Sequence, residues 1–194
     1  KLEEAIEAYN KSLSIQPDNA EAYSNMGATL QEQGKLKYSI EAFSNALTLQ
    51  PDNAEAYNNM GMSLIYQGKL EEAIAAFNKA LAIQPDYEAA RGQKLHQLAH
   101  ICDWDAIGKD STLIPSLGTG KKFIPPFVML SLEDAPDSHR IRSEVYARAI
   151  YPQKPLPLPA KPLKKPKRIK IGYFSTDFKE HPVAYLIAKV LEQH

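Results

Sequence analysis

The sequence predicts a mainly α-helical protein, in which paired helices form an α-α superhelix that a proline-rich linker connects to the first strand and helix of an α/β lobe. Three observations lead to this class. A 34-residue period runs through about the first ninety positions, each period holds two amphipathic helical patterns, and an apolar run near the C-terminus precedes a polar loop and another helical pattern. The predicted divisions are paired helices at 1–92, a capping helix and helical region at 93–150, a linker at 151–167 and the truncated lobe at 168–194.

The composition is typical of a cytoplasmic globular chain. The 194 residues are 44% hydrophobic and carry no formal net charge. No run approaches the roughly 18 apolar residues that a membrane span needs, and the first ten residues lack the apolar core of a signal peptide. Cys102 is the single cysteine, so an internal disulfide is excluded, and its neighbour Ile101 suggests a small buried side chain.

The charges are unevenly distributed along the chain. Residues 1–90 hold 6 basic and 13 acidic side chains, whereas 151–170 hold seven basic side chains and no acidic one. Such a basic run can bind nucleic acid, but six prolines and the lack of interleaved aromatic residues favour an extended, solvated linker. We therefore expect neither nucleic acid nor a membrane as partner. The basic residues of the run are Lys154, Lys161, Lys164, Lys165, Lys167, Arg168 and Lys170.

The N-terminal period is strict. The word PDNAEAY occurs at 17–23 and 51–57, and GKL occurs at 34–36 and 68–70. A period of 34 with two amphipathic helices per unit resembles the tetratricopeptide repeat. The large and small residues expected of that repeat are Tyr23, Gly27, Leu30, Phe43, Ala46 and Pro51 in one unit, and Tyr57, Gly61, Leu64, Phe77, Ala80 and Pro85 in the next. One half repeat and two full repeats are therefore predicted.

The first helices of stacked repeats commonly line a concave groove, and Asn25 and Asn59 occupy equivalent positions on them. An amide offers a donor and an acceptor, so a row of amides can hold the backbone of an extended peptide. The alternative is that both side chains satisfy local helix or loop groups. The sequence leaves these two interpretations open.

The chain begins at the second helix of a repeat, which leaves Leu2, Ile6 and Tyr9 without the partner helix of their own unit. Solenoids protect such ends with capping units. We therefore expect further repeats ahead of Lys1 in a parent protein, or self-association through this end.

After the repeats, residues 86–107 are predicted to form one amphipathic helix that caps the array, with Leu95, Leu98 and Trp104 on one face. His96 and His100 lie four residues apart, a spacing that can place two imidazoles on a metal. No third ligand sits in register, so the prediction is two surface or capping histidines and no metal.

The region from 113 to 130 is predicted to be a loop with short helical pieces, because it is rich in glycine and proline. Within it, SLGTGK at 116–121 lacks the spacing of a phosphate-binding loop. A further helix is expected from about Ser138 to Ile150, with Asp137 or Ser138 as N-cap.

The C-terminal segment has the pattern of a strand, a loop and a helix. An apolar strand is expected within Arg168–Ser175, and Pro182 suits the first position of a helix over Val183–Gln193. This is how a Rossmann-like domain begins, and His181 lies where the ligand crevice of such a domain would be. A histidine at this place is otherwise a cap or a surface residue. The isolated strand would expose two edges, which predicts self-association through it.

Four features of the sequence occur in a characteristic order. They are the repeats, the segment Cys102–Trp104, PFVMLSLEDAP at 126–136 and IKIGYFSTDFKEHPVAYL at 169–186. Together they resemble the protein O-linked N-acetylglucosamine transferases of glycosyltransferase family 41, bacterial members above all. The resemblance implies a catalytic region of two Rossmann-like lobes that transfers N-acetylglucosamine from UDP-GlcNAc to Ser or Thr without a metal or other cofactor. It implies an active-site role for His181 and binding of acceptor polypeptide by Asn25 and Asn59.

The donor pocket of such an enzyme would lie beyond His194, so the 194-residue chain is expected to be inactive alone. One strand and one helix cannot position the hydrogen-bond donors that the leaving diphosphate needs. The rival interpretation is a tetratricopeptide scaffold that binds a partner protein and catalyses nothing.

Overall fold

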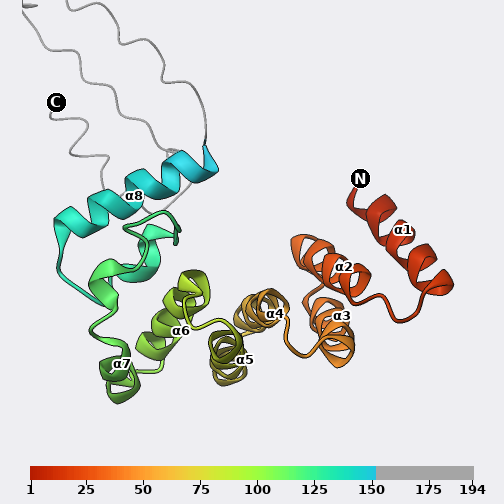
Figure 1. The fold of residues 1–194 in the computed structure, drawn as a ribbon, viewed down its shortest axis with the longest axis horizontal. Coiled ribbons are helices and arrows are strands. Elements are labelled where there is room, and N and C mark those ends of the chain that lie inside the picture. The colour runs from red at the N-terminus through yellow and green to blue at the C-terminus, as the bar shows by residue number, and fades with distance from the viewer. Residues whose placement is uncertain (152–194) are drawn as a thin grey trace, which may run out of the picture. The chain divides into compact units, whose positions relative to one another are not determined.

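The computed structural model describes residues 1–151, and these residues are entirely helical apart from turns and loops. The predicted linker, strand and helix of 152–194 lie outside the described residues. The helices are α1 (Leu2–Ile15), α2 (Ala20–Glu32), α3 (Leu36–Leu49), α4 (Ala54–Tyr66), α5 (Leu70–Ile83), α6 (Glu88–His100), α7 (Trp104–Asp110) and α8 (Pro136–Ile150), with the 3-10 turns η1 (Ile114–Ser116) and η2 (Pro126–Met129). Figure 1 shows α1 to α6 succeeding one another along the array, as the repeats and the predicted capping helix imply.

Equivalent residues begin and end the helices of successive repeats. The side chains of Asn19 and Asn53 cap α2 and α4 by accepting hydrogen bonds of 2.9 Å from the backbone N–H groups three residues later. Gly34 and Gly68 lie in the turns after α2 and α4 with φ of 73° and 77°, a conformation that other residues rarely adopt. The same local signals thus produce the same helix pair in each repeat.

Within each pair, the helices are held close by an aromatic ring against a glycine. Phe43 and Phe77 are fully buried. A Cβ placed on Gly27 would lie 2.9 Å from Cε1 of Phe43, and one placed on Gly61 would lie 2.7 Å from Cε1 of Phe77. Neither position has room for a methyl group, so the two glycines allow the closest approach between the paired helices.

A buried polar contact joins the two repeats. The Ser39 hydroxyl on α3 donates to the Gly27 carbonyl at 2.8 Å and lies 2.9 Å from the Ser63 hydroxyl on α4. Both serines are fully buried. Because each hydroxyl has a partner, the small side chains at this crossing do not carry the cost of an unsatisfied buried group.

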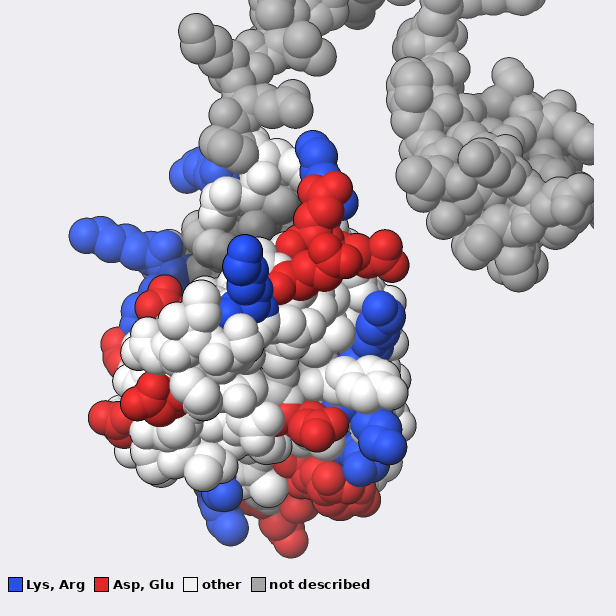
Figure 2. Space-filling model, turned by 90° about the vertical axis from the view of Figure 1, so that its right-hand side faces the viewer, with Lys and Arg blue, Asp and Glu red and all other residues white. Residues whose placement is uncertain are grey.

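Helix α1 covers the N-terminal side of the array and has no buried residue. Leu2 is exposed, whereas Ile6 and Tyr9 are half-buried. Figure 2 views the molecule from this side, where uncharged side chains cover much of the face and acidic and basic ones are interspersed among them. No helix within 1–151 has the length and apolar character needed to cross a membrane.

The single helix predicted for 86–107 is wrong, because the structure divides it into α6 and α7. Cys102 adopts a positive φ of 58° in the turn between them, and the Asp103 side chain caps α7 by accepting from the Ala106 N–H at 3.0 Å. A residue that can cap a new helix competes with continuation of the old one. The break turns Trp104 away from the core that buries Leu95. Cys102 was predicted to be buried, but it is exposed.

Residues 86–151, which follow the repeats, are called the cap of the array below, and beyond the break at Cys102 they follow the prediction in outline. The loop from 113 to 130 contains the short turns η1 and η2, and α8 ends at Ile150 as expected. The predicted N-cap of α8 is wrong: Pro136 occupies the first turn and Ala135 stands at the cap position without a side-chain bond. Proline is well suited to the first turn, since its missing N–H has no helical partner to lose there.

Replacing Gly61 with alanine tests the Gly–Phe contact. The new methyl group would press on the buried Phe77 ring, so G61A should lower the free energy of unfolding by about 1–3 kcal/mol. Urea denaturation followed by circular dichroism measures the change. The control is G108A on α7, where a Cβ meets nothing within 4 Å; this variant should be unchanged or up to about 1 kcal/mol more stable. Equal stability of the two variants would contradict the packing argument.

Candidate functional site

The two asparagines predicted to bind peptide line the same pocket. Asn25 on α2 and Asn59 on α4 lie one repeat apart, and their helices contact each other. The pocket has a volume of about 380 Å³. Its walls come from the residues Glu21, Ser24, Asn25, Ala28, Gln50, Asn53, Glu55, Ala56 and Asn59.

Only one of the two amides is engaged by neighbouring side chains. Asn59 Oδ1 accepts a hydrogen bond of 3.2 Å from Asn58 Nδ2, which leaves the Asn59 Nδ2 group as a donor. In the part of the chain that the structure describes, the Asn25 amide forms no hydrogen bond with protein, although its backbone carbonyl accepts from Thr29. The local capping role belongs to Asn19 and Asn53 instead.

The pocket carries negative charge. Glu21 and Glu55 contribute carboxylates to its wall, and none of its lining residues is Lys or Arg. Burial, and after it the negative charge of Glu55, raises the pKa of Tyr87. A ligand with positive charge would be favoured in the pocket, because its carboxylates have no Lys or Arg among the lining residues.

His96 and His100 face one another on α6. Their Nε2 atoms are 3.3 Å apart and their rings meet edge to face. Burial, and after it the neighbouring His100, lowers the pKa of His96, which favours the neutral imidazole at pH 7. Within 1–151, no group of three or more His, Cys, Asp or Glu side chains is placed to hold a metal ion. The absence of a metal in the functional protein stays a prediction.

The histidines border an apolar pocket that sequence reasoning missed. The pocket has a volume of about 360 Å³ and is lined by His96, Ala99, His100, Trp104, Phe127, Leu130 and Ser131. It exists because α7 turns away after α6 and because η2 returns to pack on α6. The prediction of one continuous helix placed Trp104 in the core, so the sequence offered no sign of this surface.

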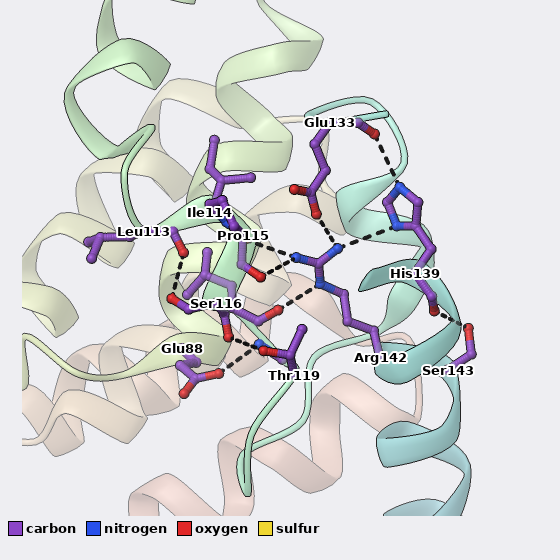
Figure 3. Close-up of polar contacts among 12 residues, drawn as sticks. Glu88, Leu113, Ile114, Pro115, Ser116, Thr119, Glu133, His139, Arg142 and Ser143 are labelled. Carbon is purple, nitrogen blue, oxygen red and sulfur yellow. Dashed lines mark hydrogen bonds and ion pairs between the residues drawn. The ribbon is translucent and has the colours of Figure 1, made fainter. Parts of the chain in front are cut away.

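Among residues 1–151, Arg142 on α8 is the largest fully buried side chain, and the sequence analysis did not predict its burial. Its Nε donates to the Leu117 carbonyl at 2.7 Å, and Nη2 donates to the Ile114 carbonyl at 2.9 Å (Figure 3). An ion pair with Glu133 neutralises its charge. Because the guanidinium donors are used by the protein itself, Arg142 is a structural residue that joins α8 to the η1 turn.

The segment at 116–121 does not form a phosphate site. The Gly118 N–H donates at 2.8 Å to the carboxylate of Glu88, so an acidic side chain of the protein itself occupies the position that an anion would need. His181, the predicted catalytic residue, lies outside the described residues.

The repeated helix pairs, the Gly–Phe contacts and the pocket between α2 and α4 define a tetratricopeptide-type superhelix with a helical cap. Family comparison agrees for the repeat region: residues 1–34 match a model described as TPR repeat, and residues 18–86 match one described as tetratricopeptide repeat. A search of curated protein sequences gave no match.

Solved structures of the protein MamA have a similar fold. One MamA crystal structure is 23% identical over 75% of this chain and 82% of its own, with a TM-score of 0.61. A second is 22% identical over 80% of this chain and 89% of its own, with a TM-score of 0.60. A fragment of MamA from Desulfovibrio magneticus RS-1, from residue 41 to its end, is 21% identical over 60% of this chain and 66% of its own, with a TM-score of 0.55. At these identities the likeness concerns the fold.

Replacing Arg142 tests its structural role. R142L would leave Glu133 and several carbonyls buried without their partner, so the free energy of unfolding should fall by about 3–5 kcal/mol. The matched control is R140L on the same helix, which removes an exposed ion pair with Glu144 and should cost at most about 1 kcal/mol. Urea denaturation distinguishes them, and a similar loss in both variants would show that Arg142 is not essential to the cap.

Proposed function

We propose that this chain is a protein-interaction scaffold, and that the pocket between α2 and α4 binds the backbone of an extended polypeptide through Asn25 and Asn59. The observation that carries the proposal is the placement of both amides in one pocket, with the Asn25 amide free of protein partners among the described residues. The tetratricopeptide matches over 1–86 support an interaction role.

The chemistry of the pocket suits a peptide better than a small metabolite. The Asn25 amide can pair with one backbone C=O and one backbone N–H, and the Asn59 Nδ2 group, one repeat further along, can donate to another backbone C=O. Backbone recognition of this kind accepts many sequences. The carboxylates of Glu21 and Glu55 then favour segments that carry Lys or Arg.

The test selects ligands from a phage-displayed library of random 12-residue peptides and measures their binding by fluorescence anisotropy. The double variant N25A/N59A loses two or more hydrogen bonds, each worth about 0.5–1.5 kcal/mol, so its affinity should fall about tenfold or more. The control is N78A, an exposed asparagine on α5 away from the pocket, which should bind as the unmodified chain does. Selected peptides that bind both variants equally would contradict the proposed function.

A second candidate function is favoured by the sequence from Ile169 to Leu186. Its resemblance to family 41 glycosyltransferases leads us to propose that the repeats present acceptor proteins to a transferase that uses UDP-GlcNAc and no metal, with His181 in its active site. In this reaction the bond between C1 of the sugar and the diphosphate oxygen breaks, C1 forms a bond to a Ser or Thr hydroxyl oxygen, the hydroxyl proton passes to a base or to solvent, and UDP leaves. The amide pocket at Asn25 and Asn59 would serve both candidate functions.

The transferase candidate is tested on the full-length product of the gene. That product should release UDP from UDP-GlcNAc when acceptor peptides are present, and H181A should lower the rate about 100-fold or more. The control is H194A, outside the motif. The 194-residue chain alone should release no UDP. An inactive full-length protein, or an H181A variant with full activity, would leave the scaffold function as the better account.

A further inference from the structure

The apolar pocket lies beside α6, the helix that carries the next position of the amide row. Asn25 and Asn59 are 34 residues apart, and a further 34 residues lead to Gln93, a third amide, on α6. His96 and His100 follow Gln93 by three and seven residues, so all three share one face of that helix. In Figure 1, α2, α4 and α6 succeed one another along the array. A peptide that follows the amides therefore runs toward the pocket beside His96.

This pocket displays large apolar side chains that the fold leaves uncovered. Trp104 is 58% exposed, Phe127 is 73% exposed and Leu130 is 55% exposed, and all three line it. They come from α7, from η2 and from the residue that follows η2. Three exposed apolar side chains around one cavity favour a ligand that covers them, because burying that surface is worth roughly 25 cal/mol per Å².

The electrostatics of the two pockets differ in a way that selects different side chains. The amide pocket includes Glu21 and Glu55 and no basic residue, whereas the residues that line the α6 pocket are uncharged apart from the titratable His96 and His100. Burial, and after it the neighbouring His100, lowers the pKa of His96, which favours the neutral ring at pH 7. A basic side chain is favoured at the first pocket and an apolar one at the second.

We propose that the pocket formed by His96, Trp104 and Phe127 is an anchor subsite for an aliphatic or aromatic side chain of the same extended polypeptide that the amide pocket holds. The ligand class is thus an extended segment with Lys or Arg at the acidic pocket and a large apolar residue further along. This inference rests on the proposed scaffold function and adds its specificity.

The distance between the subsites sets the spacing of the motif. The helices α4 and α6 are the first helices of successive units and lie about one helix diameter of 10–12 Å apart, and three to seven residues along α6 add about 5–10 Å in a roughly perpendicular direction. An extended peptide advances about 3.3 Å per residue. The apolar anchor should therefore lie about three to six residues from the segment that the amides of Asn25 and Asn59 hold.

The chain contains its own reporter of this subsite, because Trp104 is its single tryptophan. Peptides from the random 12-residue library that bind in an Asn25- and Asn59-dependent manner should be enriched in a large apolar residue about three to six positions from a Lys or Arg. Their binding should shift the emission of Trp104 to shorter wavelength, since the indole leaves water. Replacing the apolar residue of the peptide with serine should abolish the shift.

The matched variants are F127S and I15S, which each remove an apolar side chain that is more than 70% exposed, so that neither should unfold the protein. F127S should weaken binding about tenfold and remove the Trp104 shift, whereas I15S should change neither.

Peptides that need the asparagines but bind F127S with full affinity and leave Trp104 emission unchanged would overturn the anchor subsite and spare the proposed function. Binding that needs Phe127 but not the asparagines would overturn the shared groove, and a lack of any selected peptide would contradict both.

Discussion

The contact between a buried phenylalanine ring and a glycine is the constraint on which the rest of the array depends. Phe43 against Gly27 and Phe77 against Gly61 set how closely the two helices of each repeat approach. Because both pairs have the same spacing in sequence, the two repeats have the same internal geometry. Equivalent positions on α2 and α4 are then brought to equivalent places, and this brings Asn25 and Asn59 into one pocket.

The described part of the fold carries two chemically distinct pockets. The pocket between α2 and α4 offers amides and carboxylates, whereas the pocket beside α6 offers an indole, a phenyl ring and two imidazoles. The second pocket is built where η2 packs on α6 and α8 packs on η2. Arg142 holds this packing in place, because its guanidinium ties α8 to the carbonyls of the η1 turn and to Glu133 (Figure 3).

The repeats could be predicted in detail, and the cap only in outline. Periodicity identified the paired helices and the amide positions, since each copy of the pattern supports the other. The cap occurs once, so its turns depend on single residues. The Asp103 side chain begins a new helix at a place where the hydrophobic pattern alone predicted continuation, and Cys102 and Trp104 became exposed in consequence. Nothing in the sequence indicated that Arg142 is buried, because an arginine on a polar helix is normally solvated.

By itself, the sequence determined the class of fold, the helix pairs from 1 to 92 and the register that places Asn25 and Asn59 on one face, because these follow from local propensity repeated at a constant period. The resemblance of the motif around His181 to family 41 glycosyltransferases likewise rests on the sequence alone. Only the tertiary structure decided which side chains the cap buries and which it leaves in water, since that depends on how η2 and α8 pack back on α6. The apolar pocket beside His96 is a product of that packing.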